Sequence, residues 1–282
     1  MKDNNVALLV HTCDKYQLLF RGFEQFFNKY WDFGIKCNYY FATEELDVEI
    51  EGFKNIKSGK GEWSDRLKHL LANEIKEDYV IYIQEDVWLN EPVSADFFNG
   101  LFEIAFKNHY KQIKLHSVNV YHTYETDQYL EGFNIAKVEN RHSRYLMSHQ
   151  VTLWDRQFFI SNLKPNENPW RNERRGTKRM KRTNPEIYHI DYFAQNFSHE
   201  INKNLPERKR SGFLPVSQNS MLDDLFKHFI DRFQIEKPGD KEYWEKLLFH
   251  FENALTHDGK PKPRKDDIFK RAKKFILRLL PG

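Results

Sequence analysis

The chain has 282 residues with 40% hydrophobic and 16% aromatic content, which is enough to bury a large core and excludes a disordered protein. Its 44 basic and 41 acidic residues leave a net charge of +3, which excludes the global positive field that marks nucleic-acid binders. Two cysteines, Cys13 and Cys37, are too few for a disulfide framework, and the apolar run Val6 to Val10 is too short for a signal peptide or a membrane span. We therefore expect a cytoplasmic protein.

The first ninety residues alternate between strand-like and helix-like segments. Val6 to Val10 is continuously apolar, as in a strand buried on both faces, and Tyr16 to Tyr30 carries apolar side chains at helical spacing. Further strands are predicted over 36–43, 53–56 and 79–83, and a helix over 64–75 with Ser64 at its N-cap. This alternation predicts an α/β fold with a doubly wound, mostly parallel sheet and helices on both faces.

The rest of the chain predicts a second half and a C-terminal extension. Expected elements are a helix over 97–107, strands over 112–120 and 145–153, a helix over 155–163, a long loop over 164–185, and amphipathic helices over 221–233 and 241–255. We divide the chain into a catalytic domain at 1–215, with a nucleotide-sugar half at about 1–95 and an acceptor half at about 96–215. A helical extension at 216–258 and a basic linker with an amphipathic helix at 259–282 follow.

One predicted strand ends on two adjacent carboxylates. In YVIYIQEDVWL, at 79–89, five strand-forming residues lead directly into Gln84, Glu85 and Asp86. Ligands of a doubly wound sheet bind at the carboxyl ends of its strands, and hard oxygen atoms are the ligands that Mg²⁺ and Mn²⁺ prefer. The pair could hold a divalent cation that bridges the protein to a diphosphate. Alternatively, it only solvates the end of the strand and caps the next turn.

A second polar group stands at the predicted helix start. Ser64, Asp65 and Arg66 combine free backbone N–H groups with a guanidinium, and both attract phosphate or a sugar hydroxyl. The competing interpretation is ordinary capping, with Asp65 favourable at the helix dipole and Arg66 solvated. The preceding Trp63 favours a binding role.

Three segments resemble one enzyme family. HTCDKY at 11–16, GEWSDRLKHLL at 61–71 and the strand that ends on QED at 84–86 resemble the nucleotide-sugar half of GT-A fold bacterial glycosyltransferases of the surface and capsular polysaccharide type. The resemblance covers about residues 5–175. It implies a UDP- or GDP-sugar donor and a divalent cation, Mn or Mg. The residues that it implies as donor contacts are His11, Thr12, Asp14, Trp63, Asp65, Arg66, Gln84 and Glu85, with Asp86 as the metal ligand. Gln84 stands where the family's DxD motif has its first acid, so cation binding is expected to be weaker.

The acceptor side carries the candidate base. SHQVTLW at 148–154 and ENPWRNE at 167–173 resemble the stretch that contacts the acceptor in this family, where an inverting enzyme places a carboxylate base. Glu173 is the first choice for that base and Glu167 the second, although either can be a solvated loop acid. Trp154 and Trp170 could stack on sugar rings, or pack in the core.

Two segments are strongly basic. RNERRGTKRMKR at 171–182 has seven Arg or Lys residues and could bind an anionic glycan, a lipid diphosphate or the donor diphosphate. Residues 260–282 hold nine basic and two acidic side chains, and their apolar residues fall on one helical stripe. Such a helix adsorbs to anionic bilayers, which predicts peripheral association with the inner membrane face. The alternative is a terminal helix that packs on its own protein.

These features predict a glycosyltransferase that moves a sugar from a nucleotide-sugar donor to a bacterial surface glycan or lipid-linked acceptor. One alternative is a non-catalytic polyanion- or nucleic-acid-binding protein that uses 171–182 and 260–278, but the acidic balance of residues 1–259 opposes it, and we expect no nucleic acid partner. Another is a nucleotidyltransferase, which needs a glycine-rich phosphate loop. HTCDKY contains no glycine.

Overall fold

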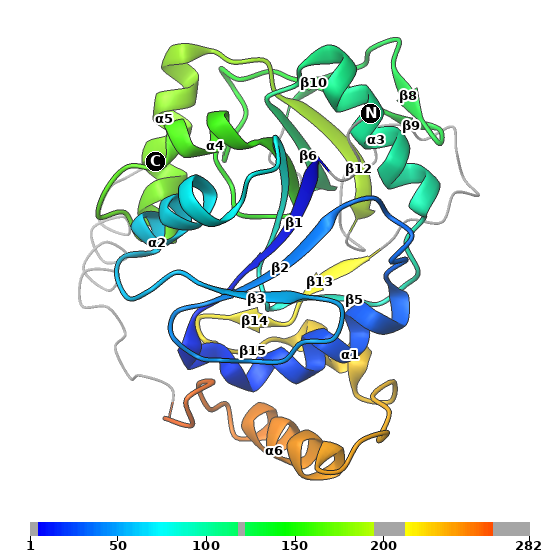
Figure 1. Ribbon diagram of the computed structural model, residues 1–282, viewed down its shortest axis with the longest axis vertical. Helices are drawn as coiled ribbons and strands as arrows, with labels where there is room; N and C mark the ends of the chain where they lie inside the picture. The colour runs from blue at the N-terminus through cyan, green and yellow to red at the C-terminus, as the bar shows by residue number, and fades with distance from the viewer. Residues whose placement is uncertain (1–4, 118–121, 195–211, 262–282) are drawn as a thin grey trace, which may run out of the picture.

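A computed structural model describes residues 5–117, 122–194 and 212–261, and its centre is one nine-stranded sheet in the order β3-β2-β1-β4-β11-β6-β12-β10-β7 (Figure 1). Its strands are β1 (Val6–His11), β2 (Asn38–Thr43), β3 (Lys54–Lys57), β4 (Tyr79–Ile83), β6 (Gln112–Ser117), β7 (Thr123–Tyr124), β10 (Ala136–Val138), β11 (Thr152–Asp155) and β12 (Tyr188–Ala194). Three two-stranded pieces accompany it: β5 (Val87–Leu89) with β13 (Phe213–Pro215), β8 (Tyr129–Leu130) with β9 (Phe133–Asn134), and β14 (Ser217–Gln218) with β15 (Met221–Leu222).

The sheet is mixed. β3, β2, β1 and β4 are parallel, as the alternating first ninety residues predict. β11 then runs antiparallel between β4 and β6, β12 is parallel to β6, and β10 and β7 are antiparallel to their neighbours. The α/β fold with helices on both faces is confirmed, and β11 is the strand that changes a parallel sheet into a mixed one.

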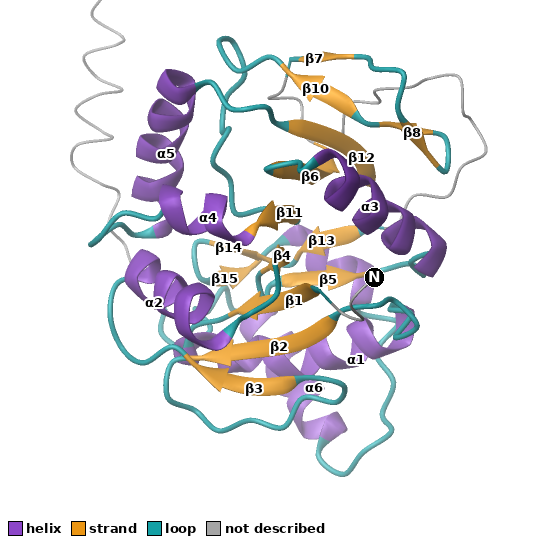
Figure 2. Cartoon of the chain, turned by 45° about the horizontal axis from the view of Figure 1, so that its top comes forward, coloured by secondary structure: helices purple, strands orange, loops and turns teal. Residues whose placement is uncertain are grey.

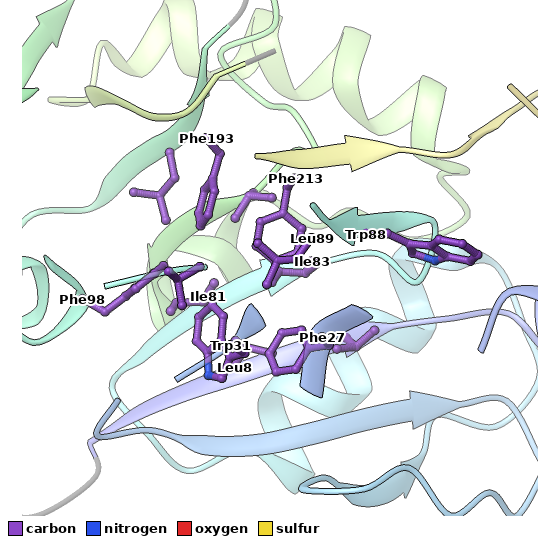
Figure 3. Close-up of a cluster of buried hydrophobic side chains, with 14 of the residues drawn as sticks. Leu8, Phe27, Trp31, Ile81, Ile83, Trp88, Leu89, Phe98, Phe193 and Phe213 are labelled. Atoms are coloured by element: carbon purple, nitrogen blue, oxygen red, sulfur yellow. The ribbon is translucent and has the colours of Figure 1, made fainter. Parts of the chain in front are cut away.

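Helices cover both faces of the sheet (Figures 1 and 2). They are η1 (Asp14–Leu19), α1 (Phe20–Tyr30), α2 (Trp63–His69), η2 (Leu70–Glu74), α3 (Ala95–Asn108), α4 (Arg156–Asn162), α5 (Pro169–Thr183), η3 (Asp224–Phe229) and α6 (Asp240–Glu252). Alternate residues of β1 point to opposite faces: Leu8 belongs to the cluster with α1 and α3, and Leu9 to the cluster with α2 and α4. Figure 3 shows part of the first cluster, in which the ring of Phe27 stacks on that of Trp31 beside Leu8.

Three predicted local features differ from the structure. Most of the expected loop over 164–185 is the helix α5, which begins with Pro169 and is capped by Asn168, whose Oδ1 accepts from the Arg171 amide at 2.9 Å. Ser64 is not an N-cap: it lies inside α2, and its hydroxyl accepts from the Glu167 amide at 3.0 Å. The strand expected over 145–153 is limited to β11, because the residues before it follow an irregular path.

The segment after Pro215 is only partly helical. It begins with the β14–β15 hairpin where a helix over 221–233 was expected, continues through η3, and ends with α6, whose side chains attach it to α1. Arg21 on α1 forms an ion pair with Asp240, and the Tyr243 hydroxyl accepts from the Gly22 amide at 2.9 Å. This extension therefore packs on α1, in the N-terminal part of the chain. Within the described ranges, no helix is both long and apolar enough to cross a bilayer. The predicted tail helix lies outside the described residues.

Candidate active site

A cavity of about 1010 Å³ opens at the carboxyl ends of β1 and β4, where the parallel half of the sheet predicts a ligand site. The turn after β4, the first turns of α2 and α5, and residues 213–225 line it. Eight predicted residues lie on its wall: His11, Thr12, Trp63, Arg66, Gln84, Glu85, Asp86 and Glu173. Asp14, Asp65 and Glu167 do not line it.

Aromatic rings form one corner of the cavity. The Trp63 ring lies 5.9 Å from the His11 ring and 4.1 Å from the His149 ring, measured between centroids. Burial holds the pKa of His11 well below its usual value and lowers the pKa of His149 to about 3, so both imidazoles are neutral at pH 7. His11 Nε2 has no hydrogen-bond partner among the described residues. The corner therefore offers flat apolar faces with polar edges, which suits a heterocyclic base.

Arg66 places a cation beside this corner. Its side chain is almost fully buried, and Nη1 donates to the Thr12 carbonyl at 3.1 Å and to the Ser58 hydroxyl at 3.2 Å. The nearest carboxylate, that of Glu44, is 3.6 Å away. Arg66 Nε makes no hydrogen bond within the described part of the chain. Because the Arg66 guanidinium is held mainly by neutral oxygen atoms, its positive charge can still attract an anionic ligand in the cavity.

Glu85 and Asp86 occupy the middle of a tight turn between β4 and β5. The Val87 amide donates to the Gln84 carbonyl at 3.1 Å, and the backbone carbonyls of Glu85 and Asp86 accept from Trp88 Nε1 and from the Val216 amide. The carboxylates form no ion pair with any described residue. Burial and the Asp86 charge hold the pKa of Glu85 well above its usual value, and burial raises the pKa of Asp86 to about 6.

The donor set of this turn fits a hard divalent cation in part. The described residues contain no group of three or more His, Cys, Asp or Glu side chains arranged as a metal site. A Mg²⁺ ion commonly takes one or two carboxylates from the protein and its remaining oxygens from substrate phosphates and water. The buried Glu85 and the half-buried Asp86, which form no ion pair within the described residues, match that pattern, so the pair would hold the ion together with a diphosphate.

Glu173 lines the same cavity from α5. It lies in the second turn of α5, and its Oε1 accepts from the His149 amide at 3.3 Å. Burial raises the pKa of its carboxyl, against the opposing effects of the His149 amide and the Lys114 ammonium. Lys114 is itself fully buried, where its Nζ donates to the Ser148 hydroxyl at 2.9 Å, and burial lowers its pKa to about 7. A carboxylate with a raised pKa in a cavity wall suits a proton acceptor.

The other three predicted residues act inside the fold. Asp14 accepts from the amides of residues 44–46 and so fixes the loop after β2. Asp65 accepts from the Asn166 amide at 2.9 Å. Glu167 is buried and accepts two hydrogen bonds from Arg179, both at 2.9 Å, and one from Asn172. These three carboxylates accept hydrogen bonds within the fold and do not line the cavity, so its geometry gives no support to the roles of Asp14 and Asp65 as donor contacts and of Glu167 as a base, which stay predictions.

The sequence reasoning missed one wall of the cavity. Pro215, Ser217 to Ser220 and Asp223 to Leu225 line it, beyond the segments in which the sequence placed candidate residues. They reach the cavity because β13 pairs with β5, and because the Tyr16 hydroxyl bonds the Ser220 hydroxyl at 2.7 Å. The only local signal was the polar run SQNS at 217–220. Trp154 is buried in the core against Phe159 and is not a sugar platform, whereas Trp170 lies on the cavity wall and is 61% exposed.

No protein-family model matches the chain, and no curated protein matches it. Among solved structures, S. aureus TarS in complex with UDP is 11% identical, with a TM-score of 0.46 over 98% of this chain and 81% of that chain. S. aureus TarS 1–349 in complex with UDP-GlcNAc is 10% identical, with a TM-score of 0.43 over 86% and 71% of the two chains. A protein from Desulfovibrio desulfuricans described as a nucleotide-diphospho-sugar transferase is 10% identical, with a TM-score of 0.41 over 86% and 98%. The identities and TM-scores of all three describe a distant similarity.

Proposed function

We propose that the protein is a glycosyltransferase that uses a nucleotide-sugar donor. One observation carries this proposal: a single cavity is lined by two adjacent carboxylates that form no ion pair within the described residues, the buried Glu85 and the half-buried Asp86, and by a third carboxylate, Glu173, on α5. Glu85 and Asp86 suit the binding of a cation and a diphosphate, and Glu173 suits the deprotonation of an acceptor hydroxyl. Arg66 and the ring of Trp63 complete a surface for a nucleoside diphosphate.

The chain's own residues support an inverting transfer. In this reaction Glu173 takes the proton from the acceptor hydroxyl as that oxygen forms a bond to the anomeric carbon. The bond from the anomeric carbon to the diphosphate breaks on the opposite side, and the nucleoside diphosphate leaves. Arg66 stabilises the negative charge that develops on the leaving group. A divalent cation held by Asp86, with Glu85, would supply further charge neutralisation there.

A donor panel tests the proposal. Thermal unfolding is measured with UDP-, GDP-, CMP- and dTDP-sugars, each with and without Mn²⁺. A ligand that binds only the native state raises the melting temperature, so one sugar nucleotide should stabilise the protein more than its free nucleoside monophosphate does. The proposal fails if none of the donors shifts unfolding and none is hydrolysed by the protein.

The acceptor and the location belong to the same proposal. A bacterial surface glycan or lipid-linked acceptor at the inner membrane face is consistent with the basic, apolar-striped sequence of residues 260–282. Deleting these residues should release the protein from anionic liposomes at low salt while donor hydrolysis continues. Sedimentation with vesicles measures this, and a truncated protein that still pellets would refute the membrane partner.

A further inference from the structure

The helix α5 carries a row of cations that leads away from the cavity. Its first turns contribute Pro169, Trp170 and Glu173 to the cavity wall, and the helix then continues at the edge of the molecule (Figure 2). Six of its basic side chains are exposed, and together we call them the α5 stripe: Arg171, Arg174, Arg175, Lys178, Lys181 and Arg182.

The fold uses this charge only in part: Arg171 and Lys181 each donate to a backbone carbonyl, and Arg175 lies 3.9 Å from the Glu167 carboxylate. α5 is held by Asn172, Gly176 and Met180, the three residues that it buries, and they lie on the side away from the stripe. Gly176 allows the helix to approach closely, since a Cβ there would lie 2.7 Å from the Met147 side chain. The only acid in the helix is Glu173, which faces the cavity. The buried face of α5 therefore contains none of the six cations.

The stripe instead works against the stability of the helix. Pairs such as Arg171 and Arg175, or Arg174 and Lys178, place like charges four residues apart, where they repel. Cations near the N-terminus of a helix also oppose its dipole. Within the described residues, Arg174, Lys178 and Arg182 form no hydrogen bond or ion pair, so half of the stripe has no protein partner. An anionic ligand would relieve this repulsion.

The exposed face of α5 favours a hydrophilic polyanion over a lipid surface. Between Arg171 and Thr183 every exposed residue is polar, so this face offers no apolar side chain to insert into a bilayer. The one exposed aromatic residue of α5, Trp170, lies at the cavity end of the helix, where an indole can stack on a sugar ring. Successive helical turns place the cations about 5.4 Å apart, and at a rise of about 1.5 Å per residue the stripe is about 17 Å long, the length of several sugar units.

We propose that the α5 stripe is the docking surface for an anionic glycan acceptor, whose end enters the cavity past Trp170 while its charged repeats lie along the helix. This inference rests on the proposed glycosyltransferase function and specifies its acceptor as a polymer that carries phosphate or carboxylate groups. The stripe increases the affinity for the acceptor and orients it toward the cavity. Glu173 and the β4–β5 turn carry out the transfer reaction.

Binding of the full chain to three labelled polymers tests the surface. The probes are inorganic polyphosphate, polygalacturonate and neutral dextran, each measured by fluorescence anisotropy over a range of salt concentrations. The triple variant Arg174→Gln, Lys178→Gln, Arg182→Gln should bind at least one anionic probe about tenfold more weakly than the unmodified protein. For this variant, the slope of log affinity plotted against log salt concentration should be smaller in magnitude by about two to three. Polyphosphate and polygalacturonate separate a phosphate-bearing acceptor from a carboxylate-bearing one, and dextran should bind weakly to every variant.

A matched variant controls for net charge. Lys107→Gln, Lys241→Gln, Lys246→Gln removes three exposed lysines from α3 and α6, which do not line the cavity, and it should keep the affinity of the unmodified protein. Equal affinities of the two triple variants for both anionic probes would overturn the proposal. So would a selective loss of binding to an oligonucleotide or to anionic vesicles with glycan probes unaffected. Donor-induced thermal stabilisation should persist in the α5 variant, so failure of the donor panel is distinguished from failure of this surface.

Discussion

Two regions of this protein bury carboxylates, and they resolve the cost of burial in opposite ways. Glu167, in the segment before α5, accepts hydrogen bonds from Arg179 and Asn172. Burial alone would raise its pKa, but these partners together hold the pKa below its usual range. In the turn after β4, Glu85 and Asp86 have no such partners among the described residues, and both pKa values are raised.

The difference separates a structural carboxylate from a site for a ligand. A buried charge that is satisfied inside the fold contributes to a fixed local geometry and has little left to offer a substrate. A buried charge that the fold leaves unsatisfied lowers the stability of the unliganded protein and is stabilised when a cation binds. The contrast predicts opposite outcomes for the same kind of substitution in the two regions.

The largest effect is expected for Asp86→Asn. Removing this carboxylate removes the anionic centre for a cation and diphosphate, so nucleoside diphosphate release from the donor should fall by at least about 10³-fold. Asp224→Asn changes an exposed carboxylate on the same cavity and should stay close to the unmodified rate. Wild-type turnover and donor affinity for Asp86→Asn would show that the turn is not part of the site.

Glu173→Gln should lower the chemical rate by about 10²–10⁴-fold, the usual cost of losing a general base, while donor affinity is retained. Single-turnover kinetics with the donor identified by thermal unfolding measures this step. The matched variant is Glu62→Gln, an exposed carboxylate that also lines the cavity. An unchanged rate for Glu173→Gln would mean a retaining reaction or a base on residues outside this wall.

Glu167→Gln should affect folding and not chemistry. Arg179 would remain in its partly buried position without its charged partner, which costs about 3–5 kcal/mol of unfolding free energy. Urea denaturation measures the loss, and donor turnover per folded molecule should be unchanged. Glu186→Gln breaks the exposed ion pair with Lys137 and should cost less than about 1 kcal/mol. A stable Glu167→Gln variant without activity would restore Glu167 as a catalytic candidate.

The parallel half of the site was predictable because its signals are local. The apolar runs of β1 and β4 identify buried strands, and the carboxyl ends of adjacent parallel strands meet at one edge, which brings His11 and Asp86 to one cavity. The helix predicted over 64–75 corresponds to α2 and η2, and Trp63 and Arg66 at its start line the cavity. The partner of Asp65 lies 101 positions away in the sequence, and those of Glu167 lie on α5, a segment that the sequence predicts as a loop.

The helix α5 and the C-terminal wall were missed for physical reasons. α5 buries only Asn172, Gly176 and Met180, so it lacks the apolar period by which a helix is recognised, and its charges suggest a loop. The wall at 215–225 reaches the cavity through the pairing of β13 with β5, a contact between residues more than a hundred positions apart. Such a long-range pairing leaves no trace in the composition of either segment.

The stability of the turn should also depend on pH. The folded state raises the Asp86 pKa from 3.8 to about 6, so ionisation of this group opposes folding. Its destabilising contribution is absent below pH 4, grows between pH 4 and 6, and reaches about 1–3 kcal/mol above pH 6. Asp86→Asn should therefore stabilise the protein at pH 7.5 more than at pH 4.5, as measured by urea denaturation. Equal effects at both values would mean that the carboxylate is not desolvated.

The smallest effect is expected for Asp65→Ala, which tests the boundary between the two kinds of carboxylate. Asp65 follows Trp63 closely in sequence, but its carboxylate accepts from the Asn166 amide at 2.9 Å and does not line the cavity. Losing this bond should cost about 1 kcal/mol of stability and leave donor affinity unchanged in calorimetry. Asp96→Ala removes an acid from the first turn of α3 and so controls for the helix dipole. If Asp65→Ala weakens donor binding while its unfolding free energy equals that of the control, Asp65 belongs to the donor site after all.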